Sequence, residues 1–254
     1  MKLIAIVLVA ACSKSSPPPP APTPVVVIAD ATIAKPALVT SEQLVTAIVP
    51  DWSSTHAELR LWQREATGWK LAMGPWAGVV GTSGTAWGVG LHGAGAPSGR
   101  SGPVKREGDG KSPAGVFALR GSYGYAARAK TELPYQTVDD NWKCVDDPKS
   151  TRYTRIFDGR GANKDWSSAE DMRRKDELYK WVVDVAHNPD ATSGAGSCIF
   201  LHVWRGPESA TVGCTAMEEA TLATLIERLH PGAMFVLLPR TDYDALAGDW
   251  NLPR

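Results

Sequence analysis

The chain has 254 residues, 43% of them hydrophobic, with 27 basic and 27 acidic side chains and a formal net charge of zero at pH 7. This apolar content is sufficient for one sizeable core or two small ones. The balanced charge argues against the clustered basic face with which nucleic-acid-binding proteins contact phosphates. We expect the ten tryptophans to pack in strands and in the core, because each buries a large apolar area.

The N-terminus has the pattern of an export signal. Lys2 precedes an apolar run from Leu3 to Val9, which is too short to cross a bilayer as a helix. Val9-Ala10-Ala11-Cys12 resembles a lipobox. We therefore expect residues 1–11 to be a signal peptide and Cys12 to be lipidated. The alternative is ordinary signal cleavage, which the small residues before Cys12 also permit.

Residues 12–41 are expected to be a tether. Their proline-rich, low-complexity composition cannot form a core and favours an extended, semi-rigid chain, although Val25 to Ile28 is compatible with a strand. A tether of this kind suits a domain held off a membrane by a lipid anchor. Ser13 after Cys12 implies, in a bacterium with two membranes, sorting to the outer membrane, so we expect a location in the cell envelope facing the periplasm.

From residue 42 the pattern changes to short apolar runs separated by turn signals. It predicts one mainly β domain over residues 42–245, followed by a C-terminal tail over residues 246–254. The glycine-rich stretch Gly81 to Gly115, which carries Trp87 and His92, is expected to form loops and a functional rim rather than core. Strands are expected at Gln43–Val49, Ala57–Gln63, Trp69–Met73, Val79–Val80, Val116–Leu119, Tyr179–Ala186, Cys198–Trp204 and Met234–Leu238.

Two helices are expected. The first is short and covers Trp166 to Arg174, with Glu170 in its first turn. The second begins directly after Cys214 and has apolar residues at helical spacing; His230-Pro231-Gly232 ends it. Its apolar positions are Met217, Leu222, Leu225, Ile226 and Leu229.

His202 and Cys214 are the candidate catalytic pair. An apolar strand ends at His202, a loop with Gly206 and Pro207 follows, and Gly213 then presents Cys214. A histidine and a cysteine at the two ends of such an excursion can meet, and an imidazolium lowers the pKa of a nearby thiol. A helix N-terminus behind the cysteine favours a thiolate further. The alternative is a small buried apolar residue, the common fate of a free cysteine.

The remaining cysteines and histidines have other expected roles. Cys144 and Cys198 either form a disulfide, which an oxidising compartment favours, or are two buried free thiols. His92, like the other histidines outside the pair, is expected at the surface or in a turn, and lining the rim of the site is its alternative. No metal and no cofactor are expected, because too few ligands converge. The expected surface or turn histidines are His56, His187 and His230, and the expected loop-capping carboxylates are Asp146 and Asp147.

Thr211-Val212-Gly213-Cys214, with His202 upstream, resembles the signature of the bacterial L,D-transpeptidases. The segment Lys105 to Leu119, with its Gly-Asp-Gly-Lys-Ser-Pro-Ala-Gly, also resembles that family. The resemblance implies a β-sandwich or barrel-like catalytic domain with a few short helices. It also implies a thioester mechanism on the peptidoglycan stem tetrapeptide, in which D-Ala leaves and an amine takes the acyl group.

The resemblance assigns roles to individual residues. Cys214 would be the nucleophile and His202 the base and later the acid. Backbone N–H groups near Gly213 and Cys214 would form the oxyanion hole, and Thr211 would shape the turn by hydrogen bonding. The candidate substrate-binding residues are Trp204, Arg205 and His92.

Two residues depart from the family pattern. Val203 stands where a glycine is frequent, so a backbone carbonyl is expected to orient His202. Ala216 stands where an arginine is frequent, so Arg205 or another residue would have to replace that cation. The expected partners are peptidoglycan stem peptides, an acceptor amine that an envelope protein can also supply, and the membrane through the lipid anchor. The alternatives are an L,D-carboxypeptidase, an inactive wall-binding lipoprotein and an unrelated cysteine peptidase.

Overall fold

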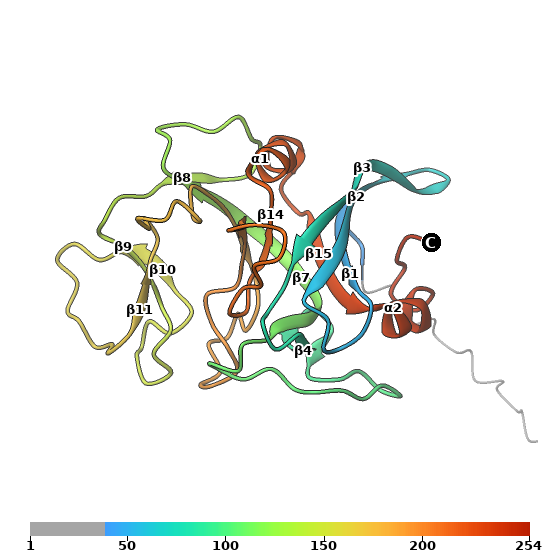
Figure 1. Cartoon of the computed structure of the whole chain (residues 1–254), viewed down its shortest axis with the longest axis horizontal. Coiled ribbons are helices and arrows are strands. Elements are labelled where there is room, and N and C mark those ends of the chain that lie inside the picture. Colours follow the sequence, from blue (N-terminus) through green and yellow to red (C-terminus); the bar gives the residue numbers. More distant parts are fainter. Residues whose placement is uncertain (1–38) are drawn as a thin grey trace, which may run out of the picture. The chain divides into compact units, whose positions relative to one another are not determined.

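The computed structural model describes residues 39–254, which form a mainly β fold, as expected. The signal peptide, Cys12 and the tether up to residue 38 lie outside the described residues. Figure 1 shows the elements, whose bounds are β1 Gln43–Val49, β2 His56–Glu65, β3 Gly68–Val79, β4 Thr85–Trp87, β5 Val89–Gly90, β6 Gly93–Ala94, β7 Ser112–Gly124, β8 Tyr135–Thr137, β9 Trp142–Val145, β10 Ile156–Asp158, β11 Ala169–Asp171, β12 Trp181–Val185, β13 Phe200–Val203, β14 Thr215–Met217, α1 Glu219–Arg228, β15 Met234–Pro239 and α2 Arg240–Leu246.

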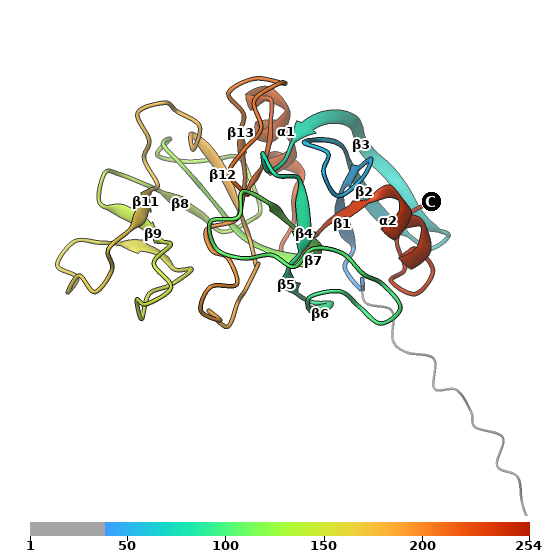
Figure 2. The same ribbon diagram turned by 60° about the horizontal axis from the view of Figure 1, so that its bottom comes forward.

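Eight strands close into a mixed β-barrel in the order β12-β13-β14-β3-β2-β1-β15-β7, and β7 pairs with β12 to complete the ring. The pairs β13–β14 and β1–β15 are parallel, and the other neighbours in the ring are antiparallel. The closed ring leaves its own strands without a free edge. Strands β4 and β8 extend from β7 outside the ring, as the turned view in Figure 2 helps to show.

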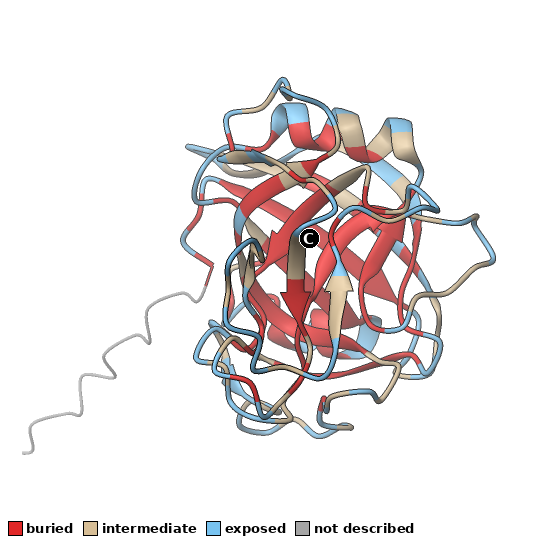
Figure 3. Ribbon diagram, turned by 90° about the vertical axis from the view of Figure 1, so that its left-hand side faces the viewer, coloured by how far each residue is buried: buried red, intermediate tan, exposed pale blue. Residues whose placement is uncertain are grey.

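Strand β1 is buried along its whole length, because both faces of the barrel are covered there. Val45, Ala47 and Val49 belong to the interior core, whereas Leu44 and Ile48 pack outward in a second cluster with residues of α2. Burial on both faces explains why this strand reads as a continuous apolar run rather than an alternating one. Figure 3 shows the buried residues concentrated on the barrel strands and the exposed residues on the loops.

The helix that was expected directly after Cys214 begins instead at Glu219, so this expectation was wrong. Residues Thr215–Met217 form β14, which pairs with β13 on one side and β3 on the other. Their backbone groups are therefore used by the barrel. The helix α1 then packs Leu222, Leu225 and Ile226 into the interior core.

The expectation of a C-terminal tail was also wrong. Part of it belongs to the helix α2, and Trp250 and Leu252 are only 6% and 5% exposed. The Trp250 indole packs edge-on against Trp87 at 6.4 Å between ring centroids. At the other end, Val39 is fully buried, so the domain begins before the expected residue 42 and ends after the expected residue 245.

Two further local expectations were wrong. Residues 166–174 form no helix; Ala169–Asp171 is the strand β11, because it pairs with β9. The glycine-rich stretch contributes to the core, since Thr85–Trp87 is a buried strand and the Trp87 ring packs on Trp52 at 5.2 Å between centroids. No helix among the described residues is long and apolar enough to cross a membrane.

A small sheet of three strands, in the order β10-β9-β11, packs on the outside of the barrel wall. Cys144 in β9 forms a disulfide with Cys198, with Cα atoms 5.9 Å apart, so the alternative of two free thiols was wrong. Both cysteines share a buried cluster with Val182 of β12 and Phe200 of β13. Figure 1 shows this sheet in yellow, on the side of the barrel opposite α2.

The buried C-terminal segment leads to a stability prediction. We expect Trp250→Ala to lower the free energy of unfolding by about 3–5 kcal/mol, because it removes a large ring from a packed aromatic cluster. The control is Asp249→Ala, the exposed neighbour, which should change it by less than about 0.5 kcal/mol. Denaturant unfolding of both variants measures this, and equal stabilities would show that the segment does not pack as described.

Candidate functional site

His202 and Cys214 lie on neighbouring strands of the barrel wall. His202 belongs to β13, and Cys214 immediately precedes β14, which runs parallel to β13 with Leu201 opposite Thr215. Side chains alternate between the two faces of a strand. Leu201 points into the barrel core, so its neighbour His202 points outward, and so does Cys214, the neighbour of Thr215. Both face the space between the barrel wall and the small sheet.

The turn before Cys214 is held by hydroxyl groups. The Thr211 hydroxyl donates to the Cys214 carbonyl at 2.6 Å and accepts from the Gly213 N–H at 3.1 Å. The Ser112 hydroxyl donates to the same carbonyl at 2.8 Å. Gly213 has φ 155°, and a Cβ there would lie 3.3 Å from the Lys111 carbonyl oxygen. A glycine is therefore favoured before the cysteine.

Cys214 is buried, with 5% of its surface exposed. Its sulfur accepts a hydrogen bond from the Phe200 N–H at 3.3 Å, and its thiol donates to the Cys198 carbonyl at 3.4 Å. Since Cys198 is half of the disulfide to Cys144 of β9, Cys214 is directly connected to the small sheet. Burial, followed by the negative charge of Glu170, raises the pKa of the Cys214 thiol.

The His202 imidazole is oriented by the backbone of the next residue, Val203. Its Nδ1 lies 2.8 Å from the Val203 carbonyl oxygen, and because a carbonyl can only accept, Nδ1 carries the proton and Nε2 the lone pair. The sequence had predicted a backbone carbonyl for this task. Burial lowers the pKa of His202 to about 4, so the imidazole is neutral at pH 7.

Both members of the pair are therefore neutral at pH 7, and the expected thiolate–imidazolium pair is not the resting state. The expected position of Cys214 at a helix N-terminus was also wrong, because α1 begins five residues later. No hydrogen bond joins His202 to Cys214 among the bonds of residues 39–254. The physical reason is burial, which disfavours the charged form of each group.

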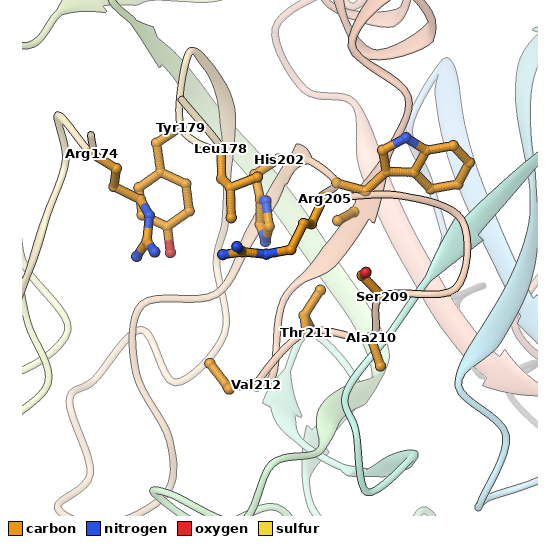
Figure 4. Close-up of a pocket in the computed structure, with 11 residues that line it drawn as sticks. Arg174, Leu178, Tyr179, His202, Arg205, Ser209, Ala210, Thr211 and Val212 are labelled. Carbon is orange, nitrogen blue, oxygen red and sulfur yellow. The ribbon is translucent and has the colours of Figure 1, made fainter. Parts of the chain in front are cut away.

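His202 and Cys214 open into two adjoining pockets that share Val212 in their walls. The pocket at His202 has a volume of about 160 Å³. Figure 4 shows His202 beside Leu178, with Tyr179 and Arg174 on one side and the turn residues Thr211 and Val212 below. The pocket also includes Trp204 and Arg205, so these candidate residues do lie beside His202.

The cations of the His202 pocket share one carboxylate. Arg174 pairs with Asp176 at 2.8 Å, and Arg205 reaches the same carboxylate at 3.2 Å. The Arg205 side chain is 65% exposed, so it is free to turn toward an anionic ligand. Such an anion would sit next to the imidazole.

The pocket at Cys214 has a volume of about 470 Å³, and most of the charged residues in its wall are acidic. Lys105 is buried there and pairs with Asp109 at 2.6 Å. Part of the wall comes from the glycine-rich stretch, which was expected to form a functional rim. The acidic residues of the wall are Glu107, Asp109, Asp146 and Glu170.

The other histidines and carboxylates lie as follows. His92 is outside both pockets and packs among Trp87, Phe117 and Trp250, so its placement at the rim of the site was wrong. His187 was expected at the surface or in a turn, but it is buried, with 3% of its surface exposed.

Asp147 does cap a loop, because it accepts hydrogen bonds from the N–H and the hydroxyl of Ser167. The side chains of His56 and His230 are 57% and 48% exposed, whereas Asp146 faces the pocket.

Three residues of the site escaped the sequence analysis: Glu170, Arg174 and Tyr179. Glu170 and Arg174 fell within a predicted helix, and Tyr179 appeared as the first residue of an apolar strand. No local pattern marks them, because they come from β11, from the loop after it and from the segment before β12, which meet at the site only in the folded chain. Among residues 39–254, no group of three or more histidine, cysteine, aspartate or glutamate side chains is arranged to hold a metal ion.

Comparison of the chain with known protein families, with characterised proteins and with solved structures found no match. The functional argument therefore depends on the geometry of the site and on the sequence motif.

The hydroxyl of Thr211 should be required for the turn. We expect Thr211→Val, which keeps the shape of the side chain, to lower the free energy of unfolding by about 1–2 kcal/mol, because two hydrogen bonds are lost. Thr224→Val is the control, since its hydroxyl lies on the exposed face of α1 and its loss should cost less than about 0.5 kcal/mol. Urea unfolding measures both, and a neutral Thr211→Val would contradict the role.

The buried histidines should make the fold sensitive to acid. Burial lowers the pKa of His187 and of His202 to about 4, below the value of about 6.5 in an unfolded chain. The unfolded state then binds more protons between these values, so we expect stability to be complete above about pH 6.5 and to fall toward about pH 4.

Melting temperatures across this range test the expectation, with His187→Gln as the comparison. His187 accepts a hydrogen bond from the Val89 N–H at Nδ1, and its Nε2 contacts the Ala195 carbonyl. A proton added to Nδ1 would therefore face the Val89 N–H and break this hydrogen bond. The variant should show a shallower decline with falling pH, and an equal decline would assign the effect to other groups.

Proposed function

We propose that the protein is a peptidoglycan L,D-transpeptidase that works through a thioester on Cys214. The observation that carries the proposal is the parallel pairing of β13 and β14. It directs a buried cysteine, in a turn held by Thr211, and a histidine whose Nδ1 is bound by a backbone carbonyl to the same outward face of the barrel wall. Acyl transfer by cysteine requires an oriented imidazole that can approach the thiol.

In the proposed reaction, the Cys214 sulfur attacks the stem-peptide carbonyl between the diamino acid and the terminal D-Ala. The neutral Nε2 of His202 accepts the thiol proton and then gives it to the leaving D-Ala amine. The incoming amine repeats the exchange in reverse and takes the acyl group. The Gly213 N–H already donates to Thr211, so the Cys214 N–H is the donor of this turn that we assign to the oxyanion.

The charges of the two pockets suit this substrate. A stem peptide carries a terminal carboxylate on one side of the scissile bond and the ammonium of its diamino acid on the other. The exposed Arg205 beside His202 suits the carboxylate, and in this respect it would replace the arginine missing at Ala216. The acidic wall around Cys214 suits an ammonium group. These features support the proposed donor peptide and an amine acceptor.

The proposed location is the cell envelope, with a lipid anchor at Cys12. The disulfide between Cys144 and Cys198 agrees with an oxidising compartment, where such bonds persist. The wall peptide, an amine acceptor on a second stem or an envelope protein, and the anchor would then occupy the same compartment. No cofactor enters the proposed reaction.

The test is a covalent adduct together with release of D-Ala. The full chain is incubated with a carbapenem and separately with a stem tetrapeptide. We expect one carbapenem mass added at Cys214 and free D-Ala, with neither in Cys214→Ser. His202→Gln should slow D-Ala release by about 10²- to 10⁴-fold, whereas His56→Gln, at an exposed histidine, should not.

Analysis of the wall-peptide products separates the related outcomes. Cross-linked or protein-linked products support transpeptidation, and trimmed stems alone would identify an L,D-carboxypeptidase. If neither an adduct nor D-Ala appears, the proposed activity is wrong and a wall-binding lipoprotein is left. Cleavage of D-Ala-D-Ala or of ordinary L-peptides would instead indicate an unrelated cysteine peptidase.

A further inference from the structure

Tyr179 packs against the candidate base His202 and shares a buried cluster with the candidate nucleophile Cys214. Its side chain comes from the segment just before β12 and is 5% exposed. Its ring meets the His202 imidazole edge-on at 5.2 Å between centroids and meets Phe200 in the same way at 5.5 Å. These contacts restrict the ring to one orientation.

The Tyr179 hydroxyl donates a hydrogen bond to the Glu170 carboxylate. Tyr179 also belongs to the buried cluster that contains Cys214 and Phe200, and Phe200, whose ring it meets, donates its N–H to the Cys214 sulfur. In the resting site the hydroxyl is therefore held on the carboxylate, in the same cluster as the thiol. A phenol has a single proton to donate, so the carboxylate and an ionised sulfur would compete for it.

The charge of the trio decides which partner receives that proton. With Glu170 ionised, its carboxylate takes the hydrogen bond, and its negative charge adds to burial in raising the pKa of the Cys214 thiol. Burial in turn raises the pKa of Glu170. Two adjacent buried anions are costly, so the resting site has its charge on Glu170 and a neutral thiol on Cys214.

We propose that Tyr179 is a catalytic residue whose hydroxyl donates a hydrogen bond to the Cys214 thiolate, and that Glu170 restrains the nucleophile by competing for that hydroxyl. The inference rests on the proposed function in taking Cys214 as the reacting group. Nothing in the sequence motif identifies either residue.

Formation of the Cys214 thiolate moves one proton and one hydrogen bond. The Cys214 S–H bond breaks and its proton passes to His202 Nε2, as in the proposed reaction. The Tyr179 O–H bond stays intact, and its hydrogen turns from the Glu170 oxygen to the sulfur. The charged groups that surround the trio are Lys105, Glu107, Asp146 and Arg174.

The two residues should have opposite effects on the reactivity of Cys214. The full chain, kept without reductant, is treated with iodoacetamide over a range of pH, and the alkylated Cys214 peptide is quantified by mass spectrometry. We expect Tyr179→Phe to slow alkylation near pH 8 by about tenfold, since one unit of pKa is tenfold in thiolate. The ring contacts with His202 remain in this variant.

Glu170→Gln should instead speed alkylation near pH 8 by about tenfold, because it removes the negative charge and weakens the competition for the hydroxyl. The double variant Tyr179→Phe, Glu170→Gln should lose this increase in alkylation rate. Tyr125→Phe is the matched control, since its hydroxyl contacts the backbone of Arg174 rather than the thiol, and its rate and pH profile should equal those of the unchanged chain.

A merely structural role would slow alkylation in neither single variant, or change both in the same direction, and either result would overturn the inference. Alkylation of Cys214 needs no wall peptide. The inference about Tyr179 and Glu170 can therefore be overturned without affecting the proposed function. Opposite effects without D-Ala release would support the Tyr179 role and overturn the transpeptidase. If D-Ala is released but the alkylation rate of Tyr179→Phe is unchanged, the proposed transpeptidase is supported and the role of Tyr179 is overturned.

Discussion

The parallel pairing of β13 with β14 is the interaction on which the site depends. It aligns Leu201 with Thr215, and the two-residue period of a strand then directs His202 and Cys214 to the same outward face. The same pairing uses the backbone of residues 215–217, so the following helix begins only at Glu219. Thr211, Gly213 and the barrel together hold the turn that makes this register possible.

Burial is the second determinant of the site. The small sheet packs on the barrel wall and is joined to it by the disulfide that ends at Cys198. His202 and Cys214 are only 6% and 5% exposed, and burial leaves both neutral, because it lowers the pKa of the imidazole and raises that of the thiol. In the proposed reaction, such a buried neutral pair would require transfer of the thiol proton to the imidazole.

The acidic pocket and the paired arginines have a common origin in the fold. Glu170 comes from β11 and Asp146 follows β9, while Lys105 and Asp109 come from the glycine-rich stretch before β7. These segments are distant in the chain and meet only around Cys214. Arg174 and Arg205 meet at Asp176 on the other side of Tyr179. The charges that would select a substrate are therefore assembled by the packing of the small sheet.

The sequence by itself determined the mainly β class and most barrel strands, because alternation is a local pattern, and its short motif predicted His202 and Cys214, which the fold directs to one face. A backbone carbonyl for His202 also followed from Val203. Only the tertiary structure decided that Trp250 is core, that His92 lies away from the site, and that residues 166–174 add a strand. It alone revealed Tyr179 and Glu170, because strand pairing and burial depend on segments far apart in the chain, which local periodicity cannot report.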